Sequence, residues 1–210
     1  MSSGTLPDKV VLATSNEGKA REFKAIFEGF GTELLLQDRF GIRAPEEDGA
    51  GFVENALIKA RHASGIAGLP ALADDSGICV DALNGQPGIM SSRFSGEEGP
   101  DRDRANNDKL LEMLNSVMDI RARAAHYVCA LALVRGRDDP DPLLAVARWE
   151  GSIAFTPAGE GGFGYDPVFY LPDRGLSAAQ LPAQIKNLLS HRARAIFRLK
   201  ARLSEYYKNE

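Results

Sequence analysis

The segment ALADDSGICVDAL, residues 71–83, gives the clearest indication of the architecture. Apolar residues stand on both sides of Asp74-Asp75-Ser76-Gly77, so the segment is predicted to be a β-strand that these four residues interrupt. Because side chains alternate between the two faces of a strand, the carboxylates of Asp74 and Asp75 are expected to point in opposite directions. Two adjacent acids in an apolar strand are costly unless they are solvated, paired or bound to a metal. A turn-prone strand end is the alternative, but the apolar residues that follow favour a functional role.

Short apolar runs and amphipathic segments alternate along the rest of the chain. The predicted strands are 10–13, 34–36, 125–135, 143–154 and 168–171. The predicted helices are 19–30, 52–67, 102–118 and 185–207. The Gly-, Pro- and Ser-rich stretch 84–100 is expected to be irregular, and the hairpin-turn composition of 136–142 predicts an antiparallel pair. The fold class that follows is mixed α/β, with a mixed β-sheet flanked by helices.

Composition limits the classes of function. The 210 residues form one domain, or two small lobes that share a core, and residues 1–8 are expected to be disordered. A net charge of −4 argues against nonspecific binding along a nucleic acid. No apolar run approaches the roughly 20 residues that span a membrane. The two cysteines, Cys79 and Cys129, form no Cys-x-x-Cys motif and argue against a zinc site. A cytoplasmic protein with two buried thiols is expected.

Thr14-Ser15-Asn16-Glu17-Gly18-Lys19 separates the first predicted strand from the first predicted helix. The amide groups and the dipole at a helix N-terminus favour phosphate, and Thr14, Asn16 and Lys19 offer further donors. The spacing is not that of a P-loop. A capped helix start with a solvated lysine explains this segment equally well when it is taken alone.

Acidic residues near the start of the second predicted helix complement Asp75. Mg²⁺ prefers one or two carboxylates together with phosphate oxygens and water. Glu46 and Glu47 are the natural second carboxylates. The residues therefore suggest a magnesium site, in which the choice between Glu46 and Glu47 is open.

Glycines crowd the segment 159–167, which also holds Phe163 and Tyr165. Glycines allow the backbone to approach a ligand closely, and two aromatic rings offer a stacking surface for a base. Further on, Lys186 and His191-Arg192 could grip a base or a phosphate, although a single histidine is more often structural. Together, these segments suggest a site for a nucleoside triphosphate.

The sequence resembles the inosine/xanthosine triphosphate pyrophosphatases, also called dITP/XTP pyrophosphatases, from residue 10 to about residue 198. The stretches that carry the resemblance are VLATSNEGKAREF, EEDGAGFVENALIKARHAS, PALADDSGICVDALNGQPGIMSSRFSGE, GGFGYDPVF and SHRARA. The resemblance implies an elongated mixed sheet, two lobes around a central cleft, and a homodimer. It also implies Mg²⁺-dependent hydrolysis of purine nucleoside triphosphates with deaminated bases to the monophosphate and pyrophosphate.

The resemblance assigns roles by motif. Asp75 resembles the catalytic residue and a metal ligand, and Glu46 resembles the second metal carboxylate. Residues that resemble substrate-binding positions are Thr14, Ser15, Asn16, Glu17, Gly18, Lys19, Ser76, Phe163, Gly164, Tyr165, Asp166, Lys186, His191 and Arg192. Residues that resemble support on the phosphate side are Asn55, Lys59 and Asp74, and Asp74 could also share the metal.

Some positions depart from the family pattern. Ser15 stands where many members have Gly, Gln184 replaces a common acid, and the stretches 101–108 and 136–142 show no strong family pattern. Two other functions remain open: a Mg²⁺-dependent nucleotide phosphotransferase, and a catalytically silent nucleotide-binding module.

Overall fold

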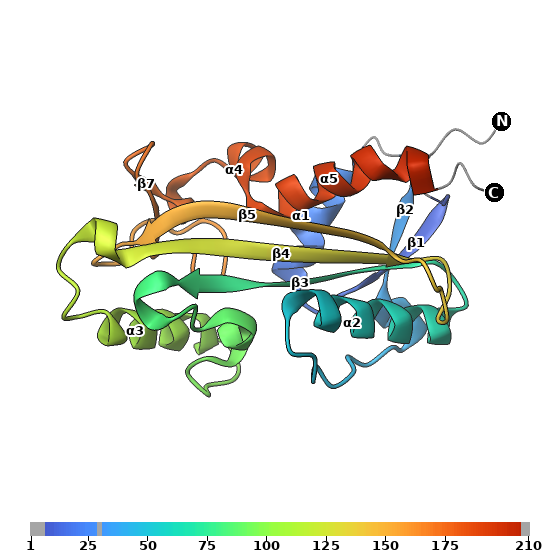
Figure 1. Ribbon diagram of the computed structural model, residues 1–210, viewed down its shortest axis with the longest axis horizontal. Coiled ribbons are helices and arrows are strands. Elements are labelled where there is room, and N and C mark those ends of the chain that lie inside the picture. The colour runs from blue at the N-terminus through green and yellow to red at the C-terminus, as the bar shows by residue number, and fades with distance from the viewer. Residues whose placement is uncertain (1–6, 29–30, 207–210) are drawn as a thin grey trace. The chain divides into compact units, whose positions relative to one another are not determined.

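The computed structural model describes residues 7–28 and 31–206, and Figure 1 shows how the chain runs. Within these residues the strands form one mixed sheet in the order β2-β1-β3-β4-β5-β6-β7. The strands are β1 (Lys9–Ala13), β2 (Glu33–Leu36), β3 (Ala71–Val80), β4 (Ala124–Val134), β5 (Leu143–Ile153), β6 (Phe169–Leu171) and β7 (Leu176–Ser177). The α-helices are α1 (Glu17–Phe27), α2 (Phe52–Ala67), α3 (Arg102–Met113), α4 (Ala183–Leu189) and α5 (His191–Tyr206). The predicted mixed α/β class is confirmed.

The chain divides into two compact units. Unit 1 consists of Met1–Asp75, Cys129–Ala147 and Arg192–Glu210, and unit 2 of Ser76–Val128 and Arg148–His191. The chain therefore passes from one unit to the other inside β3, β4 and β5, and again after His191. The central cleft that the resemblance implies stays a prediction.

Unit 1 is a sheet with helices on both faces. In β1, Val10 and Leu12 join the apolar cluster of α1 and α5, whereas Val11 and Ala13 join the cluster of α2. Figure 1 shows α2 on one side of these strands and α5 on the other. Because β1 and β3 are parallel, with Ala13 opposite Ala73, the turn after β1 lies beside the two acids of β3.

Unit 2 has its own apolar core. Leu110 and Leu114 from the region of α3 pack in one buried cluster with Tyr127 of β4, Trp149 of β5 and Phe169 of β6. β6 pairs antiparallel with both β5 and β7. The core supports the glycine-rich loop, because Tyr165 is part of the same cluster.

Several predicted boundaries hold closely. The helix predicted at 52–67 is α2, and the strands predicted at 10–13, 34–36 and 168–171 differ from β1, β2 and β6 by one residue at their starts. The link between β4 and β5 is too short for a parallel crossover, so these neighbours run antiparallel, as the sequence predicts.

Other predictions were wrong. β3 is continuous through Asp74 and Asp75, because both carboxylates find partners within unit 1 and the strand need not break. The helix predicted at 102–118 ends at Met113, a residue that is 40% exposed, whereas Leu110 and Leu114 are buried. The stretch 84–100 contains a 3₁₀ helix, Gly88–Arg93.

The helix predicted at 185–207 is also wrong, because it is two helices. Ser190 lies between α4 and α5 in an extended conformation, and its N–H donates to the carbonyl of Lys186. Three expectations fall on residues outside the described ranges: Phe30 at the end of the first helix, disorder over most of 1–8, and the last position of the C-terminal helix. None of the helices in the described part of the chain has the length and apolar character needed to cross a membrane.

Candidate active site

The turn after β1 leads into α1, which begins at Glu17, two residues before the predicted start at Lys19. Asn16 is the N-cap residue, and its Oδ1 accepts a hydrogen bond from the Lys19 N–H at 2.9 Å. Thr14 Oγ1 accepts from the Asn16 N–H at 3.2 Å. Capping satisfies one of the free amides of the first turn and leaves the others, with the positive end of the helix dipole, for an anion.

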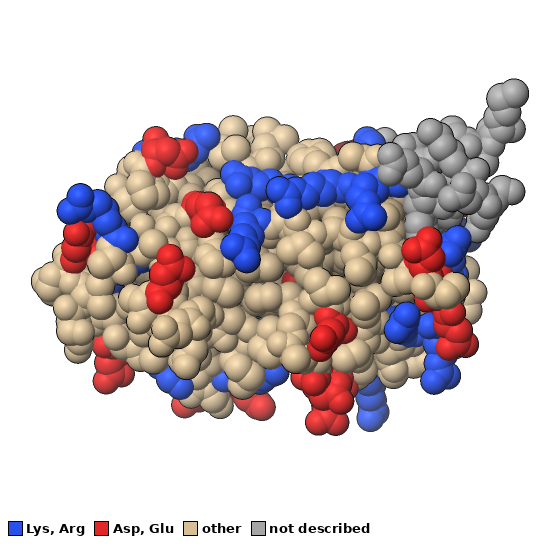
Figure 2. All heavy atoms as spheres, in the orientation of Figure 1, with Lys and Arg blue, Asp and Glu red and all other residues tan. Residues whose placement is uncertain are grey.

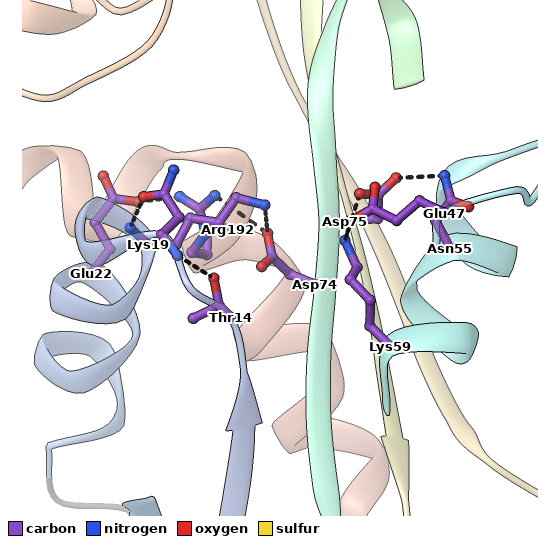
Figure 3. A network of polar contacts seen from close by, with 10 residues as sticks. Thr14, Lys19, Glu22, Glu47, Asn55, Lys59, Asp74, Asp75 and Arg192 are labelled. Carbon is purple, nitrogen blue, oxygen red and sulfur yellow. Dashed lines mark hydrogen bonds and ion pairs between the residues drawn. The ribbon is translucent and has the colours of Figure 1, made fainter. Parts of the chain in front are cut away.

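Asp74 points from β3 toward α1 and α5, as Figure 3 shows. Its Oδ2 lies 2.9 Å from Lys19 Nζ and accepts a hydrogen bond from Arg192 Nη2 at 3.4 Å. Only 1% of the Asp74 side chain is exposed. Burial by itself raises the pKa of this carboxyl, but the charges of Lys19 and Arg192 outweigh burial and hold the pKa well below its usual range. Asp74 is therefore a fixed anion.

Asp75 points to the opposite face of β3, toward α2 (Figure 3). Its Oδ1 lies 2.8 Å from Lys59 Nζ, and its Oδ2 accepts from Asn55 Nδ2 at 3.4 Å. Burial raises the pKa of the Asp75 carboxyl, and the opposing charges of Lys59 and Lys19 do not reverse that shift. Alternation along the strand thus gives the two neighbouring acids different surroundings, as predicted.

Lys59 joins two carboxylates. Its Nζ is 2.8 Å from Asp75 Oδ1 and 3.1 Å from Glu47 Oε1, whereas Glu46 is exposed. Burial by itself lowers the pKa of Lys59. The negative charges of Asp75, Asp74 and Glu47 outweigh burial and raise the pKa above its ordinary value, so the ammonium stays charged. The geometry favours Glu47 over Glu46 as the acid that accompanies Asp75.

Asp75 and Glu47 each direct one carboxylate oxygen at the Lys59 ammonium, so the two oxygens lie close together. Such a pair suits Mg²⁺, which binds few protein carboxylates and completes its coordination shell with phosphate oxygens and water. In the described part of the chain, no group of three His, Cys, Asp or Glu side chains could hold a metal by itself. The donor set of Asp75 and Glu47 therefore fits an ion that arrives with a phosphate better than a closed structural metal site.

Arg192, in the first turn of α5, links Asp74 to a residue that the sequence analysis missed. Its Nη1 donates to Glu22 Oε2 on α1, and its Nη2 donates to Asp74. Burial lowers the pKa of Arg192, but Glu22 and Asp74 raise it well above the ordinary value. Glu22 lies one turn after Lys19 in the quoted stretch VLATSNEGKAREF, and this helical spacing was the available signal.

Asp166 organises the glycine-rich loop in unit 2. Its Oδ2 accepts from the Phe163 N–H at 2.9 Å and from Lys186 Nζ at 2.5 Å, and its Oδ1 accepts from the Tyr127 hydroxyl at 3.5 Å. Lys186 Nζ also lies 4.9 Å from the centroid of the Phe163 ring. The loop, α4 and β4 therefore meet at one buried carboxylate.

His191 is part of an aromatic stack in unit 2. Its ring lies 4.4 Å from that of Tyr127, at an interplanar angle of 9°, and 6.4 Å from that of Trp149. Tyr127 also lies 4.6 Å from Phe169. The sequence analysis missed Tyr127, which stands in an apolar run where an aromatic residue gives no functional signal.

The structure groups the predicted residues into two clusters. The strand-acid cluster of unit 1 contains Thr14, Asn16, Lys19, Asn55, Lys59, Asp74, Asp75 and Arg192. The glycine-loop cluster of unit 2 contains Phe163, Gly164, Asp166, Lys186 and His191. The other predicted positions differ in their exposure. Ser15 and Glu17 are exposed, Gly18 is buried in the first turn of α1, and Ser76 is half-buried at the start of unit 2.

Tyr165 has a different place from the one the sequence suggests. It is buried in the core of unit 2, and its hydroxyl donates to the carbonyl of Ser91 at 2.8 Å. Burial raises the pKa of this hydroxyl, and the nearby charge of Asp103 raises it further. Phe163 therefore remains as the aromatic residue of this loop that could stack on a base.

A family model described as the Ham1 family matches residues 10–202, a range that contains both clusters. The chain belongs to the Ham1 family. A Ham1 relative from Burkholderia pseudomallei, named dITP/XTP pyrophosphatase, is 51% identical over 198 residues and is matched over 94% of each chain. A protein of the same name from Bordetella pertussis is 54% identical over 192 residues, which are 91% of this chain and 89% of its own.

Solved Ham1 structures share the fold. The structure of a HAM1 protein from Coxiella burnetii matches with a TM-score of 0.85 and 43% identity, over 94% of this chain and 98% of that one. The family resemblance that the sequence motifs indicated is therefore confirmed.

Proposed function

We propose that this chain is a dITP/XTP pyrophosphatase, which hydrolyses deaminated purine nucleoside triphosphates (ITP, dITP and XTP) to the monophosphate and pyrophosphate. The observation that carries the proposal is the pair of acids on β3. Lys19 and Arg192 neutralise Asp74, while Asp75 faces Lys59 and Glu47. The names of relatives about 50% identical over most of the chain support the same reaction.

The triphosphate binds at the start of α1. The free amides of the first turn, the Thr14 hydroxyl and the Lys19 ammonium are donors and positive charges for phosphate oxygens. Lys19 already neutralises Asp74, so the fixed anion holds this ammonium at the turn. A nucleophile can approach phosphorus only after the negative charge of the triphosphate is compensated.

Magnesium is the proposed cofactor, held by Asp75 with Glu47, or with Glu46 as the family resemblance first suggested. When bound, the ion supplies positive charge to the phosphate oxygens and acidifies bound water. Asp75 orients the water that attacks the α-phosphorus and accepts its proton at a carboxylate oxygen. Lys59 and Asn55 hold the carboxylate in place.

The glycine-loop cluster selects the base. Hypoxanthine and xanthine present a 6-oxo acceptor, whereas adenine presents a 6-amino donor. Donors from Lys186 and His191, or from backbone N–H groups of the loop, satisfy the oxo group and face the amino group donor to donor. A site built on such hydrogen bonds rejects the wrong base by large factors. Phe163 supplies the stacking surface.

A substrate panel tests the proposal. Purified protein is incubated with ITP, XTP, dITP, GTP or ATP, with and without Mg²⁺, and the products are separated by liquid chromatography. We expect the monophosphate and pyrophosphate from ITP, XTP and dITP, and little turnover of ATP. A nucleoside diphosphate with a phosphorylated acceptor would instead identify a phosphotransferase, and no turnover of any nucleotide would identify a silent binding module.

Asp75→Asn tests the role of the carboxylate. We expect kcat for ITP to fall at least about 100-fold, because the proton acceptor is lost while the shape of the side chain is kept. Asp81→Asn, an exposed position soon after β3, is the matched control and should leave kcat unchanged. Near wild-type turnover by Asp75→Asn would remove Asp75 from the mechanism.

The setting of the enzyme is also a proposal. Cys79 and Cys129 are free thiols, which supports a cytoplasmic location. A net charge of −4 supports a small-molecule substrate over a nucleic-acid or membrane partner. The family resemblance supports a homodimer, which light scattering after size-exclusion chromatography would test.

A further inference from the structure

Phe163 sits in a stretch of backbone that needs anchors. Gly162 and Gly164 on either side of it have φ angles of +74° and +62°, in the left-handed region that favours glycine. At Gly162 a Cβ atom would lie 2.0 Å from Asp166 Oδ2, so no side chain fits there. Two flexible residues around one aromatic side chain carry a high entropy cost when the loop is ordered.

One anchor is internal to the loop. Asp166 accepts the hydrogen bond from the Phe163 N–H and thereby fixes the backbone before the aromatic side chain. A second internal contact follows Phe163, because its carbonyl accepts a hydrogen bond from the Asp166 N–H at 3.3 Å and closes a turn over Gly164 and Tyr165.

A second anchor comes from α3 and holds both polar groups of Gly164. The Gly164 N–H donates to Asp103 Oδ2 at 2.8 Å, and Asn107 Nδ2 donates to the Gly164 carbonyl at 3.0 Å. Asp103 and Asn107 are four residues apart, so they lie on the same face of α3. The backbone on both sides of Phe163 is thus fixed, once by the loop and once by the helix.

The helix that provides this anchor is itself held firmly. Asn106 Nδ2 donates to the carbonyls of Ser91 and Ser92, each at 3.3 Å, and its Oδ1 accepts from the Ser95 N–H at 2.7 Å. Arg102 donates to the other carboxylate oxygen of Asp103 at 3.1 Å. Asn107 is only 6% exposed. The helix therefore holds Gly164 through two hydrogen bonds, in addition to the turn that the loop closes over it.

We propose that Asp103 and Asn107 are positioning residues for base recognition: they act through the Gly164 peptide to hold Phe163 ready for the purine. The inference rests on the proposed function, since it assumes that Phe163 contacts a base. It concerns a segment, 101–108, whose sequence shows no strong family pattern, and neither residue belongs to the predicted site.

Preorganisation determines which kinetic constant should change. When the loop is ordered before binding, no binding free energy is lost to ordering it. When the loop has lost its anchor, part of the binding free energy is used to order it, so the affinity falls. Asp103 and Asn107 do not touch the strand-acid cluster, so the chemical step should be unaffected. Their loss should raise KM and leave kcat nearly unchanged.

The experiment compares Asp103→Ala, Asn107→Ala, the conservative Asp103→Asn and the control Asp108→Asn. Asp108 is an exposed acid on the same helix and makes no contact with the loop. With ITP as substrate, we expect Asp103→Ala and Asn107→Ala each to raise KM about tenfold and to leave kcat within twofold of the wild type. A tenfold change is the size expected for the loss of one charge-assisted or buried hydrogen bond. Asp103→Asn keeps an acceptor oxygen and should recover most of the affinity. Asp108→Asn should match the wild type.

Hydrogen exchange on the same variants provides a readout that does not depend on turnover. Asp103→Ala and Asn107→Ala should lose protection in a peptide covering 161–169, while the protection of α2 stays at the wild-type level. Unchanged protection of that peptide, or an unchanged KM beside a lower kcat, would overturn the positioning role. If the wild type hydrolyses no nucleotide while the variants lose protection, the anchor stands and the proposed function fails.

Discussion

The pKa values of two adjacent carboxyl groups on β3 are shifted in opposite directions. Asp74 has the charges of Lys19 and Arg192 beside it, and its pKa lies below the usual range. Asp75 has a pKa above its usual value because burial dominates. The surroundings on the two faces of one strand therefore shift the pKa values of neighbouring acids in opposite directions.

Asparagine at each position should separate these roles. Asp74→Asn removes one of the carboxylates that neutralise the buried guanidinium of Arg192, and we expect a loss of about 3 kcal/mol in the free energy of unfolding. Asp75→Asn leaves Lys59 beside Glu47, and we expect a loss of about 1 kcal/mol. Urea unfolding without added metal measures both. Equal losses would show that the two acids are not electrostatically distinct.

The sequence identifies the chemistry of single residues better than their partners. Alternation along a strand predicts that Asp74 and Asp75 point to opposite faces, and the turn after the first strand allows a capped helix start, although it does not single out Asn16 as the cap. The contact between Glu22 and Arg192 joins residues far apart in the chain, and no local pattern indicates it. The preference for Glu47 over Glu46 likewise appears only when α2 places Lys59.

At the level of elements, the break between α4 and α5 decides where His191 and Arg192 lie. In a single continuous helix, the directions of the His191 and Arg192 side chains would follow from the helical repeat of the preceding residues. The extended Ser190 resets that periodicity, so the pair stands in the first turn of a new helix. Helical spacing continues through the break, which explains why the sequence predicts one helix.

α5 also covers the part of β5 that lies before the pairing of β5 with β6 at Ser152 and Ile153. Figure 2 shows Lys and Arg side chains gathered in a row over this helix. On this helix, Arg198 and Arg202 donate hydrogen bonds to the carbonyls of Val146 and Leu144 on β5. Strand carbonyls that lack a neighbouring strand are ready to pair with another chain, and charged side chains are a common protection.

Replacing both arginines should expose that edge. For Arg198→Ala/Arg202→Ala we expect a loss of at most about 1 kcal/mol in stability, because both side chains are exposed, but a clear rise in aggregation on heating. Light scattering during a thermal ramp measures it, and Arg21→Ala on the exposed face of α1 is the control. Aggregation equal to that of the control would show that the two hydrogen bonds do not protect the strand.

Local patterns predict elements well where packing agrees with them. α2 has a clear apolar face and begins and ends where the sequence indicates. β3 shows the limit: its acids suggest an interruption, but ion pairs with Lys19 and Lys59 keep the strand regular. The early end of α3 depends on how Leu114 and its neighbours pack in unit 2, and apolar spacing alone does not show it.

For the molecule as a whole, the connectivity of the two units matters most. Neither unit is a continuous segment, because the chain crosses between them in three strands and once more after His191. Loss of one unit therefore breaks strands that also belong to the other. We expect the chain to unfold as one cooperative system.

Two probes can test that expectation. Trp149, the single tryptophan of the chain, lies in the core of unit 2, whereas far-UV circular dichroism reports the helices of both units. Urea transitions followed by the two signals should coincide in midpoint and slope. Separated midpoints would show that the units unfold independently, in spite of the shared strands.

The alternation on β3 limits how the gene can change. Inserting or deleting one residue between Ala71 and Asp74 would exchange the faces of the two acids, so that Asp75 would meet Lys19 and Asp74 would meet Lys59. Such a change keeps every functional residue and still destroys the arrangement. Insertions and deletions should therefore be tolerated in the turn 136–142. In β3 they should not be tolerated, because a shift by one residue reverses the face to which each acid points.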